Sequence, residues 1–227
     1  RAWPAVTFDG KIMAIPGQTP YAQPTSWVFK KDLLIKHGFD NTKVTGLKDL
    51  EPYLETIKKN EPGITPLLVT GNNAAVSLSL PRYTSVAPSI SYDEETGKLV
   101  QGLDQPENID NLRTMYEFYQ KGYVAKDAAI KTDYMAEAKS GRYAVLRDAG
   151  GYTADGSKST ALYGFETAET MAHQPLISTG TLTGATTAIS RTSKNPERAM
   201  MLLNLIWKDP VLLNTLAYGI AGQDYQI

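Results

Sequence analysis

The chain of 227 residues contains no cysteine. Disulfides, thiolate metal sites and a cysteine nucleophile are therefore excluded, and this composition fits an exported protein that avoids thiols. Histidine is scarce too: His37 and His173 lie far apart in the sequence, which gives no histidine cluster for a metal. We expect no metal and no cofactor.

Excess charge and long apolar runs are also missing. The 23 basic and 24 acidic residues give a net charge of −1, which offers no electrostatic argument for a nucleic acid or an anionic membrane. No run reaches the length of a transmembrane helix, and no signal peptide is visible. The sequence begins at Arg1 inside what reads as running domain sequence, so we expect a fragment, with any export signal or lipid-anchor cysteine upstream of Arg1.

Catalytic motifs are equally absent. Gly150 and Gly151 lack the third glycine and the Lys-Ser/Thr pair of a phosphate-binding loop. The acidic trio of residues 93–95 has no spaced oxygen ligands for calcium, so we interpret it as a solvated turn. No nucleophile–base pair is evident, and we predict that the protein is not an enzyme.

The stretch 8–39 organises the chain. We expect two short strands, 11–16 and 26–29, and then a helix that ends at Gly38 with His37 as a capping residue in its last turn. A proline-punctuated connector, 17–24, joins the strands. Such a connector suits either a ligand-facing crossing between two lobes or an ordinary loop.

Strand and helix patterns alternate along the rest of the chain, which predicts an α/β fold. Residues 109, 112, 115, 116 and 119 form an apolar stripe that we expect to be core, and residues 200, 203 and 207 form another. We predict helices at 45–60 (starting or kinked near Pro52), 106–122, 134–140 and from near 196 and 210. We predict strands at 64–70, at 142–146 and at the end of 179–190. Residues 92–98 are interpreted as a hairpin tip, 156–159 as a loop and 163–172 as a polar, mobile-looking stretch.

Polar side chains follow two of these strands. Asn72 and Asn73 come after 64–70, and Asp148 and Tyr152 come after 142–146. In α/β folds ligands bind beyond the carboxyl ends of strands. Amides suit hydroxylated ligands, although Gly71 followed by two asparagines is equally typical of a turn.

Several segments in one order resemble the extracellular solute-binding proteins of ABC importers, in the family-1 group that includes maltose-binding protein. They are FDGKIMAIP, WVFKKDLLIKHGFD, TGLKDLEPYLETIKKNEPGITPL, NIDNLRTMYEFYQKG, MAEAKSGRYAVL and TTAISRTSKNPERAMMLLNLIWKDP. The ending LAYGIAGQDYQI is similar to the YGIEGKHY element of LipO-like lipoproteins, with Ala221, Gln223 and Asp224 in place of Glu, Lys and His.

The resemblance implies a periplasmic-binding-protein-like fold of type II, with two lobes joined by crossing strands and an incomplete first lobe. Residues 1–27 and 175–227 would form the partial N-terminal lobe and the crossing, and residues 28–174 the C-terminal lobe. Gly150 and Gly151 replace bulkier residues of relatives, so an aromatic sugar platform would depend on Tyr152. The implied ligand-binding residues are Tyr21, Gln23, Trp27, Asn72, Asn73, Asp148, Tyr152, Thr179 and Thr181.

The resemblance thus predicts a carbohydrate, and in particular an oligosaccharide, captured between the lobes for the membrane permease of an ABC importer. We expect an extracellular, lipid-anchored monomer. A receptor for peptides, polyamines or other small solutes is an alternative, because Asp148 near Tyr152 could meet a cation. A glycoside hydrolase would need a second carboxylate about 5 to 10 Å from the first, and Asp148 has no evident partner acid. A structural or adhesion module is a further alternative.

Overall fold

The computed structural model describes residues 2–17, 24–71, 82–87, 89–148, 152–172, 177 and 179–226, with the backbone alone at positions 84, 85, 87 and 148. The chain divides into two compact units. Unit 1 combines Arg1–Thr19 with Thr179–Ile227, and unit 2 is Pro20–Ser178. The lobe boundaries expected from the sequence, at 27/28 and 174/175, stay a prediction.

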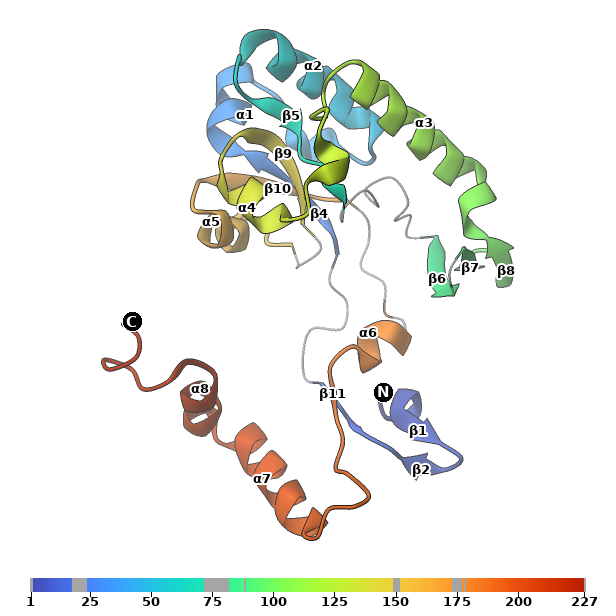
Figure 1. Ribbon diagram of the computed structural model, residues 1–227, viewed down its shortest axis with the longest axis vertical. Coiled ribbons are helices and arrows are strands. Elements are labelled where there is room, and N and C mark those ends of the chain that lie inside the picture. The colour runs from blue at the N-terminus through green and yellow to red at the C-terminus, as the bar shows by residue number, and fades with distance from the viewer. Residues whose placement is uncertain are drawn as a thin grey trace. The chain divides into compact units, whose positions relative to one another are not determined.

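Unit 2 is built on a four-stranded sheet in the order β10-β4-β9-β5 (Figure 1). The strands are β4 (Ser26–Lys30), β5 (Thr65–Leu67), β9 (Tyr143–Asp148) and β10 (Thr167–Met171). β4 is antiparallel to both of its neighbours, whereas β5 is parallel to β9. The carboxyl ends of β5, β9 and β10 therefore meet at one edge of the sheet, together with the first residue of β4.

Helices cover both faces of this sheet, because its strands are apolar on both faces. On one face, α1 (Lys31–His37) and α2 (Glu51–Asn60) pack in a cluster that includes Phe29, Leu67 and Val145. On the other face, α4 (Tyr134–Lys139) and α5 (Ser157–Tyr163) pack on Val28, Leu68 and Leu146. The predicted α/β class is confirmed.

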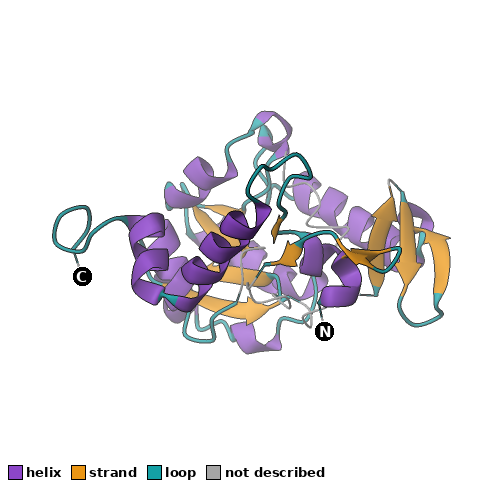
Figure 2. Cartoon of the chain, turned by 90° about the horizontal axis from the view of Figure 1, so that it is seen from below, coloured by secondary structure: helices purple, strands orange, loops and turns teal. Residues whose placement is uncertain are grey.

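A second sheet, β6-β7-β8, precedes the long helix α3 (Pro106–Gln120) in the sequence. Its strands are the orange arrows at the right of Figure 2. They are β6 (Tyr83–Ala87), β7 (Ile90–Asp93) and β8 (Lys98–Gln101). The predicted hairpin is β7–β8, whereas β6 was missed. The solvated-turn interpretation is wrong for Asp93, which is buried and accepts two hydrogen bonds of 2.9 Å from Arg82.

The helix expected within 45–60 begins at Glu51, which confirms the predicted start near Pro52. The Asp49 carboxylate accepts hydrogen bonds from the backbone N–H groups of Thr45 and Gly46 and stabilises a turn before the helix. The predicted boundaries of another element are wrong. The strand expected at 11–16 is two strands, since β2 (Lys11–Ile12) pairs with β1 (Thr7–Phe8) and β3 (Ile15–Pro16) pairs with β11 (Thr186–Thr187).

The segment 156–172 was also misread. We predicted a loop at 156–159 and a mobile-looking stretch at 163–172, whereas the segment forms α5 and the edge strand β10. Buried hydrogen bonds explain the polar sequence: the Ser159 hydroxyl donates to Glu169 at 2.6 Å, and Thr167 donates to the Gly156 carbonyl at 3.0 Å. Gly156 has a φ of +71°, and a Cβ there would lie 2.5 Å from the Thr167 carbonyl oxygen.

The apolar stripe predicted for α3 faces the core only in part: Met115 packs against the main hydrophobic cluster and Ile109 is half-buried. Leu112, Tyr116 and Tyr119 are exposed, with Tyr116 at 65%. The helix instead buries Asn108, Thr114 and Phe118. The short polar residues Asn108 and Thr114 are accommodated because each donates a side-chain hydrogen bond to a backbone carbonyl, of Gly102 and Asp110 respectively.

Unit 1 holds short strands and two longer helices, α7 (Pro196–Lys208) and α8 (Pro210–Tyr218), with α6 (Thr179–Thr183). Among its described residues, Val6 and Pro16 alone are buried. The predicted α7 stripe leaves Met200 and Trp207 exposed. None of the described helices has the length and apolarity to cross a membrane. Among the described residues, short 3-10 helices lie at Trp3–Val6, Asn41–Lys43 (η2), Lys48–Leu50, Gly102–Asp104 and Ala128–Ile130.

Candidate functional site

The candidate site lies at the carboxyl edge of the main sheet in unit 2. Ser26, the first residue of β4, is paired in register with Asp148 of β9 and with Met171 of β10. Residues 24 and 25 lead into β4 at this edge, and residue 172 follows β10 there. The chain therefore enters β4 and leaves β10 at the same edge of the sheet, the edge where ligands bind in open α/β sheets.

The predicted ligand-binding residues are spread over both units. Trp27 lies in β4, Asp148 ends β9, and Tyr152 follows β9 by four residues. Thr179 and Thr181 lie in α6 of unit 1. Tyr21, Gln23, Asn72 and Asn73 lie outside the described residues. A single site shared by all nine residues stays a prediction.

Trp27 packs inside this edge. Its side chain is 3% exposed, and the Arg147 guanidinium lies 5.7 Å from its ring centroid, which is a cation–π contact. Arg147 also donates a 3.4 Å hydrogen bond to the Thr25 hydroxyl, and burial lowers the pKa of its guanidinium. A buried cation at the end of an apolar strand was overlooked in the sequence. Direct contact between Trp27 and a ligand stays a prediction.

Three buried polar atoms at this edge have no hydrogen-bond partner among the described residues. They are the hydroxyls of Ser26 and Thr70 and the indole nitrogen of Trp27. A buried polar group without a partner costs about 1–3 kcal/mol, so such groups need an explanation. Ser26 and Thr70 begin and follow apolar strands, a position that could have flagged them from sequence.

One pocket contains a predicted residue, Tyr152. We name it the β10-edge pocket; its volume is about 460 Å³. One wall comes from η2 and the two residues after it, and another from the end of β10 and the residue after it. The lining residues are Thr42, Val44, Thr45, Tyr152, Glu169, Thr170, Met171 and Ala172.

The hydroxyls of this pocket are held in a hydrogen-bond network. Thr42 donates to the Asp40 carboxylate at 2.5 Å, and Thr45 donates to Asp49 at 2.7 Å. These side-chain bonds lower the pKa of both Asp40 and Asp49, so both carboxylates are ionised at neutral pH. The Thr170 hydroxyl donates to the backbone carbonyl of Asn41 at 2.8 Å and accepts a hydrogen bond from the side-chain amide of Asn41 at the same distance. The threonines were missed because their sequence reads as a connector.

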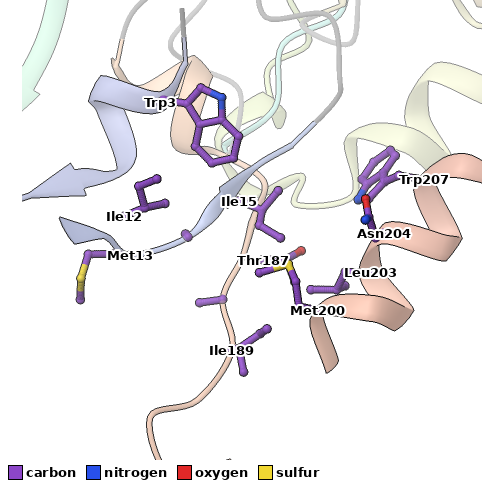
Figure 3. A pocket seen from close by; sticks show the side chains of 12 residues that line it. Trp3, Ile12, Met13, Ile15, Thr187, Ile189, Met200, Leu203, Asn204 and Trp207 are labelled. Carbon is purple, nitrogen blue, oxygen red and sulfur yellow. The ribbon is translucent and has the colours of Figure 1, made fainter. Parts of the chain in front are cut away.

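A second pocket, of about 550 Å³, lies in unit 1 (Figure 3). Met200 and Leu203 of α7 lie toward Thr187 of β11 and Ile15 of β3. Its lining carries no charged side chain and is mainly apolar, which is typical of a lobe interior. The lining residues are Trp3, Ile12, Met13, Ala14, Ile15, Thr187, Ala188, Ile189, Met200, Leu203, Asn204 and Trp207.

In the part of the chain that the structure describes, no group of three or more acidic or histidine side chains is placed to hold a metal ion.

No family model matches the chain. A carbohydrate ABC transporter substrate-binding protein of Streptococcus pneumoniae is 28% identical over 226 residues, which cover 97% of this chain and 45% of that protein. The crystal structure of the N-glycan transport solute binding protein NgtS from the same species matches with a TM-score of 0.86 at 26% identity, over 100% of this chain and 50% of that one. The fold is that of a solute-binding protein.

NgtS in complex with Man1GlcNAc also matches this chain, with a TM-score of 0.78 at 29% identity, over 98% of this chain and 50% of NgtS. The resemblance expected from the sequence motifs is thus confirmed, and the relatives are solute-binding proteins, not enzymes. The chain spans about half the length of these relatives.

Proposed function

We propose that this chain is part of a solute-binding protein that captures an oligosaccharide and delivers it to an ABC importer. The observation that carries the proposal is the match along nearly the whole chain to NgtS, which has been crystallised with Man1GlcNAc and with Man5GlcNAc. The protein performs no chemistry on the ligand; closure of two lobes around it is the working step.

The carboxyl edge of unit 2 supports this proposal chemically. Tyr152 supplies an aromatic ring, and threonine hydroxyls lie in the same pocket. A sugar places its C–H face against an aromatic ring and pairs its hydroxyls with polar groups. The proposed partners are the sugar and the permease subunits of the importer, and the proposed form is an extracellular, lipid-anchored monomer.

Calorimetric titration of the purified chain tests the proposal. We expect saturable binding of mannose- and N-acetylglucosamine-containing oligosaccharides. Tyr152→Ala should weaken it about tenfold, which corresponds to ~1.4 kcal/mol. Tyr116→Ala is the matched control, because Tyr116 is an exposed tyrosine on α3 and should leave affinity unchanged. If the chain binds peptides and shows no response to oligosaccharides, the sugar proposal is overturned and the protein is a peptide receptor.

A further inference from the structure

We propose that the β10-edge pocket is a subsite for one neutral hexopyranose unit, with Thr42 and Thr45 as hydroxyl-binding residues beside Tyr152. This inference rests on the proposed function and adds a place and a set of contacts to it. The pocket of about 460 Å³ lies within the usual size of small-molecule sites.

The two threonine hydroxyls are prepared to accept hydrogen bonds. Each donates its proton to an aspartate, Asp40 or Asp49, which leaves its oxygen lone pairs for another donor. An acceptor whose own proton is held by a carboxylate is strengthened by polarisation along the chain of bonds. A sugar hydroxyl that donates to Thr42 or Thr45 would complete such a chain.

The end of β10 adds backbone groups. β10 is an edge strand, and its even-numbered positions face β4, since Ala172 N–H donates to Thr25 and the Glu166 carbonyl accepts from Lys31. Positions 169 and 171 therefore direct their backbone groups away from β4. The Glu169 carbonyl receives one long bond, 3.5 Å from the Asn41 amide. This row of donors and acceptors suits a ligand with several adjacent hydroxyls.

The charge of the lining argues for a neutral unit. Of the eight lining residues, Glu169 alone carries a charged side chain, and no lysine or arginine lines the pocket. The Glu169 carboxylate accepts hydrogen bonds from Ser159 at 2.6 Å and from the Thr153 backbone at 3.2 Å. A phosphorylated or acidic sugar would meet this carboxylate without a compensating cation.

Apolar groups complete the match to a pyranose. Val44, Met171 and Ala172 line the pocket with the Tyr152 ring. A pyranose has C–H faces and a rim of hydroxyls, so it needs an apolar surface and polar atoms within the same few ångströms. The pocket offers both.

The first experiment locates the sugar by NMR. Methyl α-mannopyranoside and Man1GlcNAc are titrated into the ¹⁵N-labelled chain, and amide shifts are followed. We expect the shifts to concentrate at Thr42, Thr45, Thr170 and Tyr152, and methyl glucuronide to cause none there. If saccharides bind while these amides stay still, the subsite is overturned and the proposed function stands; if no saccharide shifts any amide, both are overturned.

The second experiment tests the hydroxyls. The double variant Thr42→Val with Thr45→Val should lower the affinity for Man1GlcNAc about tenfold, whereas the pair Thr42→Ser with Thr45→Ser should retain it. Thr56→Val is the matched control, because Thr56 donates to the Pro52 carbonyl on the exposed face of α2. Unfolding midpoints of all variants are measured first. An unchanged affinity in a folded double valine variant would overturn the subsite.

Discussion

The carboxylate of Asp93 gathers hydrogen bonds from three sides. Arg82 donates two, the Thr96 hydroxyl donates one at 2.8 Å, and the Glu95 backbone donates one at 3.0 Å. Arg82 also lies 3.1 Å from Glu107 at the start of α3. One arginine therefore links the second sheet to the helix that follows it.

These bonds make stability depend on pH. The Arg82 bonds hold the pKa of Asp93 below its usual range, so the charged form stabilises the fold above the unfolded-state pKa of about 3.9 and this contribution is lost as the pH falls below it. Asp93→Asn should lower the urea midpoint at pH 7. The gap between wild type and variant should narrow from about pH 5 to pH 3.

Urea unfolding at pH 7, 5, 4 and 3 measures this gap. Glu55→Gln is the control, because Glu55 is an exposed carboxylate on α2, and its substitution should leave the midpoint nearly unchanged at every pH. A gap for Asp93→Asn that widens as the pH falls would contradict the assignment.

At the scale of the element, α3 shows that an apolar stripe marks the core only where something covers it. Phe118 is fully buried and meets Tyr123 edge to face at 5.5 Å, while Tyr116 on the same helix is 65% exposed. The helix itself was predictable from Pro106 and its period. Its buried face was not, because Asn108 and Thr114 reach the interior through backbone hydrogen bonds that a hydropathy pattern does not register.

A matched pair on α3 tests this orientation. Phe118→Ala should cost about 3–5 kcal/mol of unfolding free energy, since it opens a cavity in the core. Tyr116→Ser should change that free energy by less than about 0.5 kcal/mol, as exposed substitutions do. Denaturant titration gives both values. Equal losses of unfolding free energy in the two variants would contradict the burial of Phe118 and the exposure of Tyr116.

At the scale of the whole molecule, the sequence predicted the α/β class, the family resemblance and the strand ends that carry Asp148 and Tyr152. It did not predict β10 or the contribution of Thr42 and Thr45. Their neighbour Asn41 bonds Thr170 of β10, 129 positions away, and this contact brings the segment of Thr42 and Thr45 beside β10. Local periodicity contains no such information.

The three tryptophans report on the two units separately. Trp27 is 3% exposed in unit 2, whereas Trp3 and Trp207 are about half-exposed in unit 1. Acrylamide should quench Trp3 and Trp207 and leave the Trp27 emission protected, so Trp27→Phe should remove the protected component. In a protein of the relatives' full length, we expect Trp3 and Trp207 to become protected as well. Full quenching of the wild-type emission would contradict the burial of Trp27.

The order of the strands has a consequence for synthesis on the ribosome. β4 has four consecutive buried residues, Ser26 to Phe29, yet both of its sheet neighbours are translated more than a hundred residues later. Until residue 148 has left the exit tunnel this apolar strand has neither of its native neighbours, and until residue 171 has left it β10 is still missing. The nascent chain therefore carries an open, aggregation-prone strand over more than a hundred residues of synthesis, and we expect unit 2 to need a holding chaperone during that interval.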